Sequence, residues 1–175
     1  GSAAGLSTVA AWIREGDEYD ALFGASVSSA GDVNGDGYSD VIVGAPWYAV
    51  DGDWAGRAFV FHGSPTGLSP THAWTAEAGQ YFANFGEPVS SAGDVNGDGY
   101  SDVIVGAYGY DNGQADEGRA FVYHGSAAGL SADAAWTAES DQASAWFGGS
   151  VATAGSRSAA SVRKTCSSSG SRSSR

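Results

Sequence analysis

Short apolar stretches, separated by glycine-rich or acidic turns, make up the pattern along the chain. In the first half, alternating or continuous apolar positions predict strands at residues 25–31, 40–45, 57–62 and 73–77. No segment keeps an apolar period of 3.6 residues over three turns, so the pattern predicts no helix. The sequence therefore predicts an all-β protein with four short strands in each unit.

The pattern recurs at a fixed interval along the chain. The related segments GSAAGLS, GSPTGLS and GSAAGLS begin at Gly1, Gly63 and Gly125, which is a spacing of 62 residues. The stretch SSAGDVNGDGYSDVIVGA is identical at residues 28–45 and 90–107. Four strands in a repeat of this length are typical of a β-propeller blade, a four-stranded antiparallel sheet that needs neighbouring blades to cover its faces. A β-helix is the alternative, but its repeats are usually much shorter.

The third copy of the repeat ends early and sets the expected division of the chain. Two complete blades cannot close a ring, because propellers have about four to eight blades. We therefore expect a piece of a longer protein, a homo-oligomer that completes the ring, or a domain whose cap the sequence does not reveal. The expected parts are the outer strand of a preceding blade and a linker at 1–22, blades at 23–84 and 85–146, the first strand of a truncated blade at 147–155, and a Ser/Arg-rich disordered tail at 156–175.

Charge is distributed unevenly over the 175 residues. All 20 acidic residues lie before residue 142, while five of the eight basic residues lie in the last 20 positions. Residues 1–155 therefore hold three basic and 20 acidic residues, a net charge of −17. This charge repels phosphate backbones and argues against nucleic-acid binding. No apolar run approaches the ~20 residues of a membrane span, and the lone Cys166 excludes an internal disulfide framework.

The acidic segment DVNGDGYSD carries the candidate chemistry and occurs twice, at Asp32–Asp40 and Asp94–Asp102. Oxygen-bearing side chains stand at positions 1, 3, 5 and 9, a glycine stands at position 6, and the backbone carbonyl of position 7 can point inward. Carboxylates crowded in a tight loop repel one another, and a hard divalent cation removes that repulsion. The pattern predicts two Ca²⁺ sites, with the ligands Asp32, Asn34, Asp36, Tyr38, Asp40, Asp94, Asn96, Asp98, Tyr100 and Asp102.

Two other interpretations of this loop were weighed. An EF-hand requires a Glu at position 12, where this chain has Val43 and Val105 inside predicted strands. The remaining alternative is a polar turn without a metal, because Asp, Asn and Gly all favour turns. In the third copy the aligned residues are Ser156, Ser158, Ala160 and Lys164, which cannot form a site.

Two further motifs stand at the same spacing in each repeat. The pairs are Phe23-Gly24 with Gly44-Ala45-Pro46, and Phe85-Gly86 with Gly106-Ala107-Tyr108; Phe147-Gly148 has no later partner. With the acidic loop between them, these motifs resemble the FG-GAP repeat, the blade unit of the integrin α-subunit propeller, and the near-identity of the copies is similar to the bacterial type. The resemblance implies a closed, typically seven-bladed propeller, calcium as a structural clamp, and a role in adhesion or ligand recognition.

The function expected from the residues and the resemblance is a calcium-binding module for non-enzymatic recognition or adhesion, with a protein or glycan ligand. We expect it to be extracellular or on the cell surface, with no membrane insertion and with any signal peptide outside this sequence. No catalytic motif is present, so we expect no enzyme. The alternatives are a non-catalytic portion of a secreted polysaccharide-degrading or phospholipase-like enzyme, and an oligomerising fragment with a structural role.

Aromatic and basic residues outside the acidic loops give further expectations. Trp12, Trp74 and Trp136 repeat at one position and are expected to pack between blades rather than to bind sugars. Arg57 and Arg119 are expected to form structural ion pairs. The aromatic residues that do not repeat lie in the loops after DVIVGA and are candidate ligand contacts: Trp47, Tyr48, Trp54, Tyr108 and Tyr110.

Overall fold

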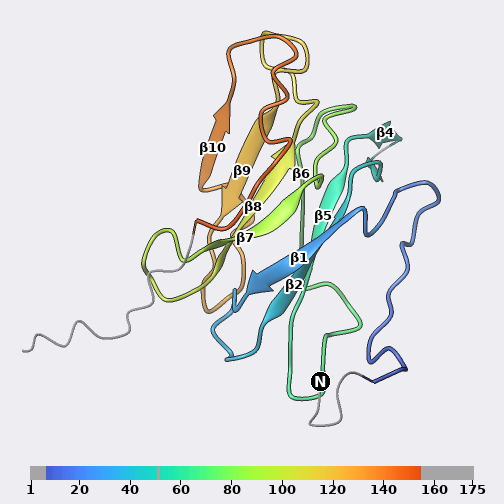
Figure 1. Ribbon diagram of the computed structural model, residues 1–175, viewed down its shortest axis with the longest axis vertical. Helices are drawn as coiled ribbons and strands as arrows, with labels where there is room; N and C mark the ends of the chain where they lie inside the picture. The colour runs from blue at the N-terminus through green and yellow to red at the C-terminus, as the bar shows by residue number, and fades with distance from the viewer. Residues whose placement is uncertain (1–6, 51, 155–175) are drawn as a thin grey trace, which may run out of the picture.

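The computed structural model describes residues 7–50 and 52–154, and this part of the chain forms strands and no helix. The first sheet has the order β1-β2-β5-β6 and the second the order β7-β8-β9-β10 (Figure 1), so the all-β prediction with four antiparallel strands per unit is confirmed. We call these sheets blade 1 and blade 2. Their strands are β1 (Ser26–Gly31), β2 (Asp40–Ala45), β5 (Arg57–Phe61) and β6 (Trp74–Glu77), then β7 (Val89–Gly93), β8 (Asp102–Ala107), β9 (Arg119–Tyr123) and β10 (Trp136–Glu139).

A small hairpin in the long loop of blade 1 was not expected. Strands β3 (Ala49–Val50) and β4 (Asp53–Trp54) pair between β2 and β5. Gly52 has a φ of +90°, which the tight reversal requires and which most other residues avoid. The hairpin has no counterpart among the strands of blade 2, whose equivalent loop has a different sequence.

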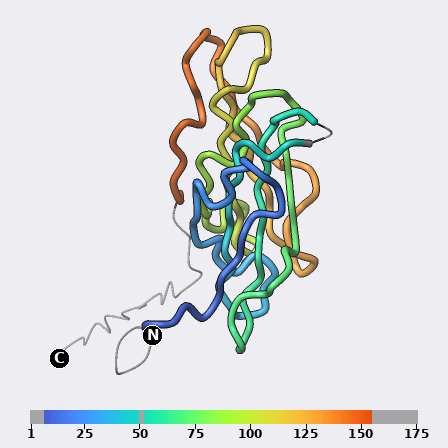
Figure 2. The backbone as a smooth tube through the Cα atoms, turned by 90° about the vertical axis from the view of Figure 1, so that its right-hand side faces the viewer, coloured from blue at the N-terminus to red at the C-terminus, as the bar shows by residue number. Residues whose placement is uncertain are grey.

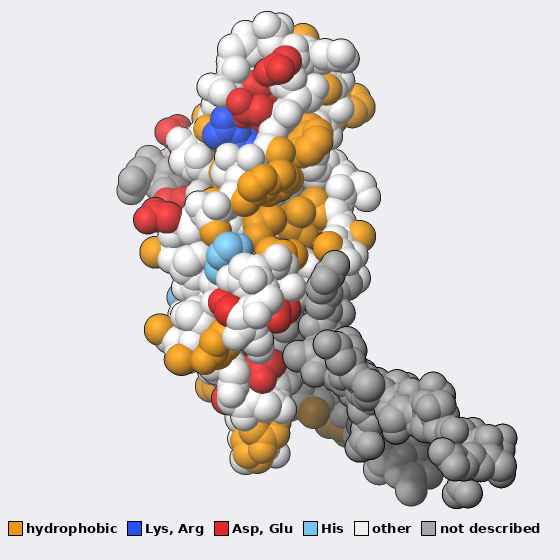
Figure 3. Space-filling model, turned by 90° about the vertical axis from the view of Figure 1, so that its left-hand side faces the viewer, with side chains coloured by type: hydrophobic (Ala, Val, Ile, Leu, Met, Phe, Trp, Pro, Cys, Tyr) orange, Lys and Arg blue, Asp and Glu red, His pale blue; other side chains and the backbone are white. Residues whose placement is uncertain are grey.

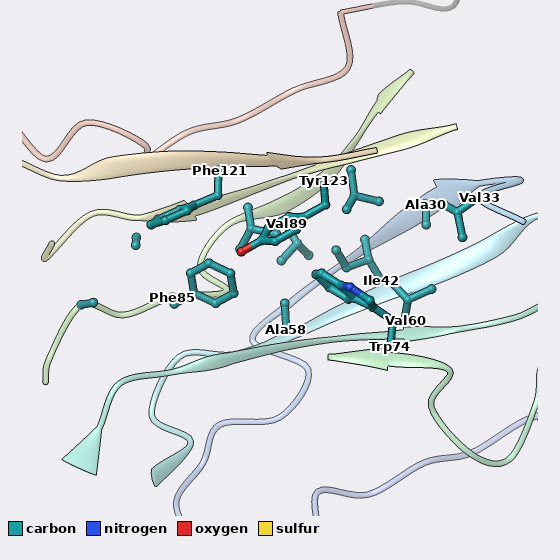
Figure 4. Close-up of a cluster of buried hydrophobic side chains, with 14 residues drawn as sticks. Ala30, Val33, Ile42, Ala58, Val60, Trp74, Phe85, Val89, Phe121 and Tyr123 are labelled. Carbon is teal, nitrogen blue, oxygen red and sulfur yellow. The ribbon is translucent and has the colours of Figure 1, made fainter. Parts of the chain in front are cut away.

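The main core lies between the two blades. In blade 1, Ile42 is opposite Val60 and Val60 is opposite Trp74, so one face of the sheet presents a continuous apolar row. This row packs against Phe85 and Tyr123 at blade 2 (Figure 4). A blade therefore becomes a folded unit only with a neighbour, because a sheet of this size exposes too much apolar surface by itself.

The other face of blade 1 is covered from the N-terminal side. Val43, Phe59 and Phe61 form a second buried cluster, and Trp12 and Phe23 pack against it. Figure 2 shows the segment before β1, in blue, running along this side of the blade. Blade 1 is thus packed on both faces, while the face of blade 2 that carries Trp136 has no such cover in the described part of the chain.

The two glycine motifs meet where one blade passes over the next. A Cβ atom at Gly44 would collide with the backbone carbonyl of Gly86, and one at Gly106 would collide with that of Gly148. The N–H of Gly86 also donates to the carbonyl of Gly106 at 3.0 Å. The Phe-Gly turn of each repeat therefore crosses the Gly-Ala segment of the preceding one, at a distance that only glycine allows.

Two expectations at the margins concern single strands. Within the described residues, no strand is formed over 7–22 or over 147–154. Phe147 forms an isolated bridge with Gly118, and the N–H of Ala154 donates to the carbonyl of Ala92 in β7 at 3.2 Å. The division of the chain into these parts remains a prediction. The predicted tail at 156–175 lies outside the described residues. Within the described residues, no helix is long and apolar enough to cross a membrane.

Candidate metal loops and an aromatic patch

Each acidic loop is organised around its first aspartate. Asp32 Oδ1 accepts hydrogen bonds from the N–H groups of Gly35 at 2.7 Å and Asp36 at 3.1 Å, and its Oδ2 accepts from Gly37 at 2.8 Å. Asp94 repeats the arrangement with the N–H groups of the equivalent residues. The glycines at positions 4 and 6 have positive φ, which allows the backbone to curl around this carboxylate.

The third and fifth positions of the loop are linked to each other. Asn34 Nδ2 donates to Asp36 Oδ2 at 3.0 Å, and Asp36 Oδ1 accepts from the N–H of Tyr38 at 2.9 Å. The hydrogen bond from Tyr38, followed by that from Asn34, lowers the pKa of Asp36 below its ordinary value. The exposed end of the loop thus keeps its carboxylate ionised, which is the form that binds a cation.

Asp40, at the ninth position, has different surroundings. It is fully buried; its Oδ2 accepts from the N–H of Val33 at 2.9 Å, and its Oδ1 accepts from Gly63 at 2.8 Å. Burial raises the pKa of Asp40, and these two hydrogen bonds oppose that shift. Asp102 makes the same two bonds in blade 2. Both carboxylates fasten the acidic loop to the connection after the third strand of the blade.

The donor chemistry of the loops fits a hard cation, although the carboxylates are turned toward the backbone. Among the described residues, no three His, Cys, Asp or Glu side chains are gathered closely enough to hold a metal ion. The ligands predicted in each loop are all oxygen donors, and the side chains at loop positions 1, 3 and 5 are exposed or partly exposed. A bound cation would therefore replace hydrogen bonds between side chains and backbone N–H groups, and the ligand set remains a prediction.

The two acidic loops differ in the contacts that they make with a neighbouring blade. In blade 1, the carbonyl of Asp32 accepts from the N–H of Ser101 at 2.9 Å, and that of Val33 accepts from Ser126 at 3.1 Å. Tyr100 of blade 2 packs over Gly35, and Asn34 Nδ2 lies 3.3 Å from His62 Nδ1. The first loop is therefore held between two blades, whereas the second lies on the uncovered side of blade 2.

A second candidate site lies on the connecting loops of blade 1. The rings of Trp47 and Trp54 are nearly parallel, with centroids 6.4 Å apart, and Trp54 contacts Phe82 edge to face at 5.9 Å. Phe82 in turn contacts Tyr81, and all four side chains are exposed. We call these four residues the aromatic patch. The equivalent residues in blade 2 are Gly109, Asp116, Ala143 and Ser144, so the repeat itself does not require the patch.

Other aromatic residues of these loops have structural positions. The guanidinium of Arg57 lies 4.3 Å from the ring centre of Tyr48, and that of Arg119 lies 4.2 Å from Tyr110. The same arginines pair with Glu77 and Glu139, which confirms the expected ion pairs. The structure therefore moves Tyr48 and Tyr110 from candidate ligand contacts to packing. Tyr81 and Phe82 were missed, although their mismatch with Ala143 and Ser144 marks them in the sequence.

Comparison with known proteins agrees with this architecture. Residues 23–61 and 88–123 match the FG-GAP repeat. The chain is 34% identical over 143 residues to integrin alpha-6 of Gallus gallus, which covers 79% of this chain and 12% of that protein. It is 37% identical over 122 residues to integrin alpha-6 of Homo sapiens, covering 67% and 10%. For integrin alpha-PS2 of Drosophila melanogaster the identity is 39% over 105 residues, covering 57% and 7%.

Two segments of the chain therefore match the FG-GAP repeat, and the chain is similar to integrin α-subunits, while it spans about a tenth of the length of these relatives. Each matched segment covers β1, β2 and β5 of blade 1 or β7, β8 and β9 of blade 2, which supports the resemblance to FG-GAP propeller blades. The three relatives are animal proteins and give no support to the bacterial type.

Proposed function

We propose that this chain is a calcium-binding, non-enzymatic recognition or adhesion module that works outside the cell or at its surface. The observation that carries the proposal is the duplicated loop Asp32–Asp40 and Asp94–Asp102, in which the backbone curls around the first carboxylate in both blades. The similarity to integrin α-subunits supports the adhesion role and the location. The first loop also lies at the boundary between blades, so a cation there would stabilise the packing of one blade on the next.

The aromatic patch supports the recognition part of the proposal. Monomeric proteins rarely expose several large aromatic side chains together unless they contact a partner. Phe82 also has a φ of +56°, a conformation that is strained for a bulky residue and that its counterparts Asp20 and Ser144 adopt more readily. The expected ligand is a glycan or a protein surface that covers these rings.

Thermal unfolding in calcium and in EDTA tests the metal part. A site that binds only the folded chain stabilises it by about 2.7 kcal/mol at a calcium concentration 100-fold above its Kd, so we expect a clear rise in Tm. The double variant Asp36→Ala/Asp98→Ala is expected to lose this rise. Asp53→Ala, an exposed acid outside the loops, is the matched control and keeps it. Identical melting curves of the parent chain with and without calcium would refute the calcium site.

A glycan array and a panel of extracellular-matrix proteins, probed with and without EDTA, test the recognition part. We expect binding to at least one member, and we expect Trp54→Ala to weaken it about tenfold or more, as at a central aromatic contact. Trp146→Ala removes an exposed tryptophan outside the patch and serves as the control. Binding that survives Trp54→Ala but fails in Trp146→Ala would contradict the assignment of this surface.

A further inference from the structure

One face of blade 2 is uncovered and apolar. Figure 3 shows hydrophobic side chains gathered beside a histidine on the left-hand side of the molecule as drawn in Figure 1. A hollow of about 470 Å³ lies on blade 2. We call its lining the open face: Val95, Asn96, Val122, His124, Ala135 and Trp136.

The open face has a counterpart of identical sequence in blade 1, and that counterpart contacts blade 2. All six of its residues recur 62 positions earlier as Val33, Asn34, Val60, His62, Ala73 and Trp74. Blade 2 buries part of that counterpart: Trp74 is 9% exposed, whereas Trp136 is 51% exposed, and Val33 is 0% exposed, whereas Val95 is 47% exposed. Val60 and Val122 are both buried, and Ala73 and Ala135 are both exposed. The tryptophan and the first valine of this surface therefore lie in an interface in one copy of the repeat and are exposed in the other.

The receptor for the tryptophan is defined by the contact within the chain. The ring of Trp74 lies edge to face on Tyr123, with centroids 4.9 Å apart, and its Nε1 donates to the carbonyl of Ser131 at 2.9 Å. Blade 1 carries the same receptor 62 residues earlier, at Phe61 and Ser69. A tryptophan of this repeat position thus recognises one aromatic ring and one serine carbonyl on the next blade.

The receptor on blade 1 is filled by the N-terminal segment. Trp12 lies edge to face on Phe61, with centroids 5.2 Å apart, and its Nε1 donates to the carbonyl of Ser69 at 3.1 Å. Trp12 therefore makes the contact that Trp74 makes, but it comes from a segment that forms no strand. The described residues hold three such tryptophans and two receptors, which leaves Trp136 without one.

We propose that the open face binds a second copy of this chain, head to tail, with Trp136 entering the Phe61 and Ser69 receptor of that copy in place of Trp12. The occupant follows from continuity with the interface between blades 1 and 2, because donor surface and receptor already recognise each other there. Strand β10 pairs with β9, so the backbone of Trp136 is already held in a strand before binding. Trp12 belongs to a segment that forms no strand, and its release recovers the conformational entropy of that segment. Association costs translational and rotational freedom, so the exchange is expected to depend on concentration.

The internal interface also indicates which backbone groups meet across the new contact. The N–H groups of Ser101 and Ser126 reach the first acidic loop within the chain, and their equivalents in blade 1 are Ser39 and Ser64. These groups in the second copy face the carbonyls of Asp94 and Val95. Because the contact joins different surfaces, it repeats from copy to copy and closes into a ring if the rotation between blades suits. Propellers have roughly four to eight blades, so rings of roughly two to four copies are expected.

Sedimentation velocity of the full 175-residue chain, over about a hundredfold range of concentration in calcium and in EDTA, tests the proposal. We expect the mass to rise with concentration, and Trp136→Ser to weaken association at least about tenfold, as for an aromatic residue at the centre of an interface. Trp136 is half exposed, so this variant keeps its fold. Tyr81→Ser, which removes an aromatic side chain that is 53% exposed between β6 and β7, is the matched control and leaves association unchanged.

The variant Trp12→Ser is expected to change association in the opposite direction to Trp136→Ser. It empties the receptor and is expected to strengthen association several-fold, with Trp12→Phe as a milder form if blade 1 loses stability. A monomer at every concentration overturns the proposal, and so does equal weakening by Trp136→Ser and Tyr81→Ser, which would indicate unspecific apolar contact. Weakening by both Trp12 variants overturns it as well, because it would make Trp12 part of the interface.

Discussion

Blades 1 and 2 share an identical stretch of 18 residues, at 28–45 and 90–107, and yet they differ in what they bury. Val27 of β1 is exposed, while its equivalent Val89 in β7 is buried against blade 1. Trp74 is buried, while Trp136 is exposed. The sequence of a blade therefore fixes its strands, and the neighbouring blade decides which of its faces become core. One apolar face of blade 1 becomes core only because blade 2 packs on it.

The largest expected difference between the blades is the effect of removing the repeated tryptophan. Trp74→Ala leaves a cavity between the blades and is expected to cost about 3–5 kcal/mol of unfolding free energy. Trp136→Ala removes an exposed side chain and is expected to cost less than about 1 kcal/mol. Urea unfolding at low protein concentration measures both. Equal losses of unfolding free energy would show that Trp74 and Trp136 have the same surroundings in solution. That result would contradict the difference in burial between the two positions.

A second difference concerns the acidic loops and rests on the proposed calcium sites. The first loop is held by Ser101 and Ser126 of blade 2, so its ligands are better preorganised than those of the second loop. We expect calorimetry to resolve two unequal sites, with Kd values differing several-fold. Asp36→Ala should remove the tighter site and Asp98→Ala the weaker one. Two equal sites, or the tighter site surviving in Asp36→Ala, would contradict the role of the neighbouring blade.

The smallest expected difference lies in the ion pairs at the outer strands. The hydrogen bond from Asn112, followed by that from Arg119, lowers the pKa of Glu139 below its ordinary value. A lowered pKa in the folded state gives stability above the unfolded pKa, and that stability is lost as the pH falls through the folded value. We therefore expect Glu139→Gln to lower the Tm at neutral pH and to approach the parent chain as the pH falls below the folded pKa.

The control for this pair is Glu77→Gln in blade 1. The pair of Arg57 with Glu77 has no asparagine corresponding to Asn112, because the equivalent residue is Val50. We expect a smaller Tm change for Glu77→Gln, measured by the same melts across the pH range. A larger change for Glu77→Gln, or a Glu139→Gln effect that grows as the pH falls, would contradict this assignment.

Much of the fold was predictable because the repeat carries strong local signals. The four strand ranges of blade 1 agree with the structure to within one residue at each end. The packing of Trp12 and Trp74 and the pairing of Arg57 and Arg119 were predictable as well, because a side chain repeated at a fixed position in every unit usually serves the unit itself.

The rest depends on contacts between distant segments. Spacing placed Asp40 among the loop oxygens but gave no indication that it turns inward to the N–H groups of Val33 and Gly63. The aromatic patch joins residues that lie about 30 positions apart, so no local pattern shows it. The segment at 7–15 has the composition of its strand-forming equivalents, but a strand also needs an edge beside it.

Because Gly86 crosses over Gly44, the start of blade 2 lies on top of the second strand of blade 1. The N–H of Phe85 donates to the carbonyl of Ala55, so residues that follow the last strand of blade 1 complete its hydrogen bonding. During synthesis, blade 1 cannot complete its edge until about residue 86 has left the ribosome. A single-blade fragment that ends at residue 84 would lack the hydrogen bond from Phe85 to Ala55. A fragment of such a repeat should therefore end after the Phe-Gly turn.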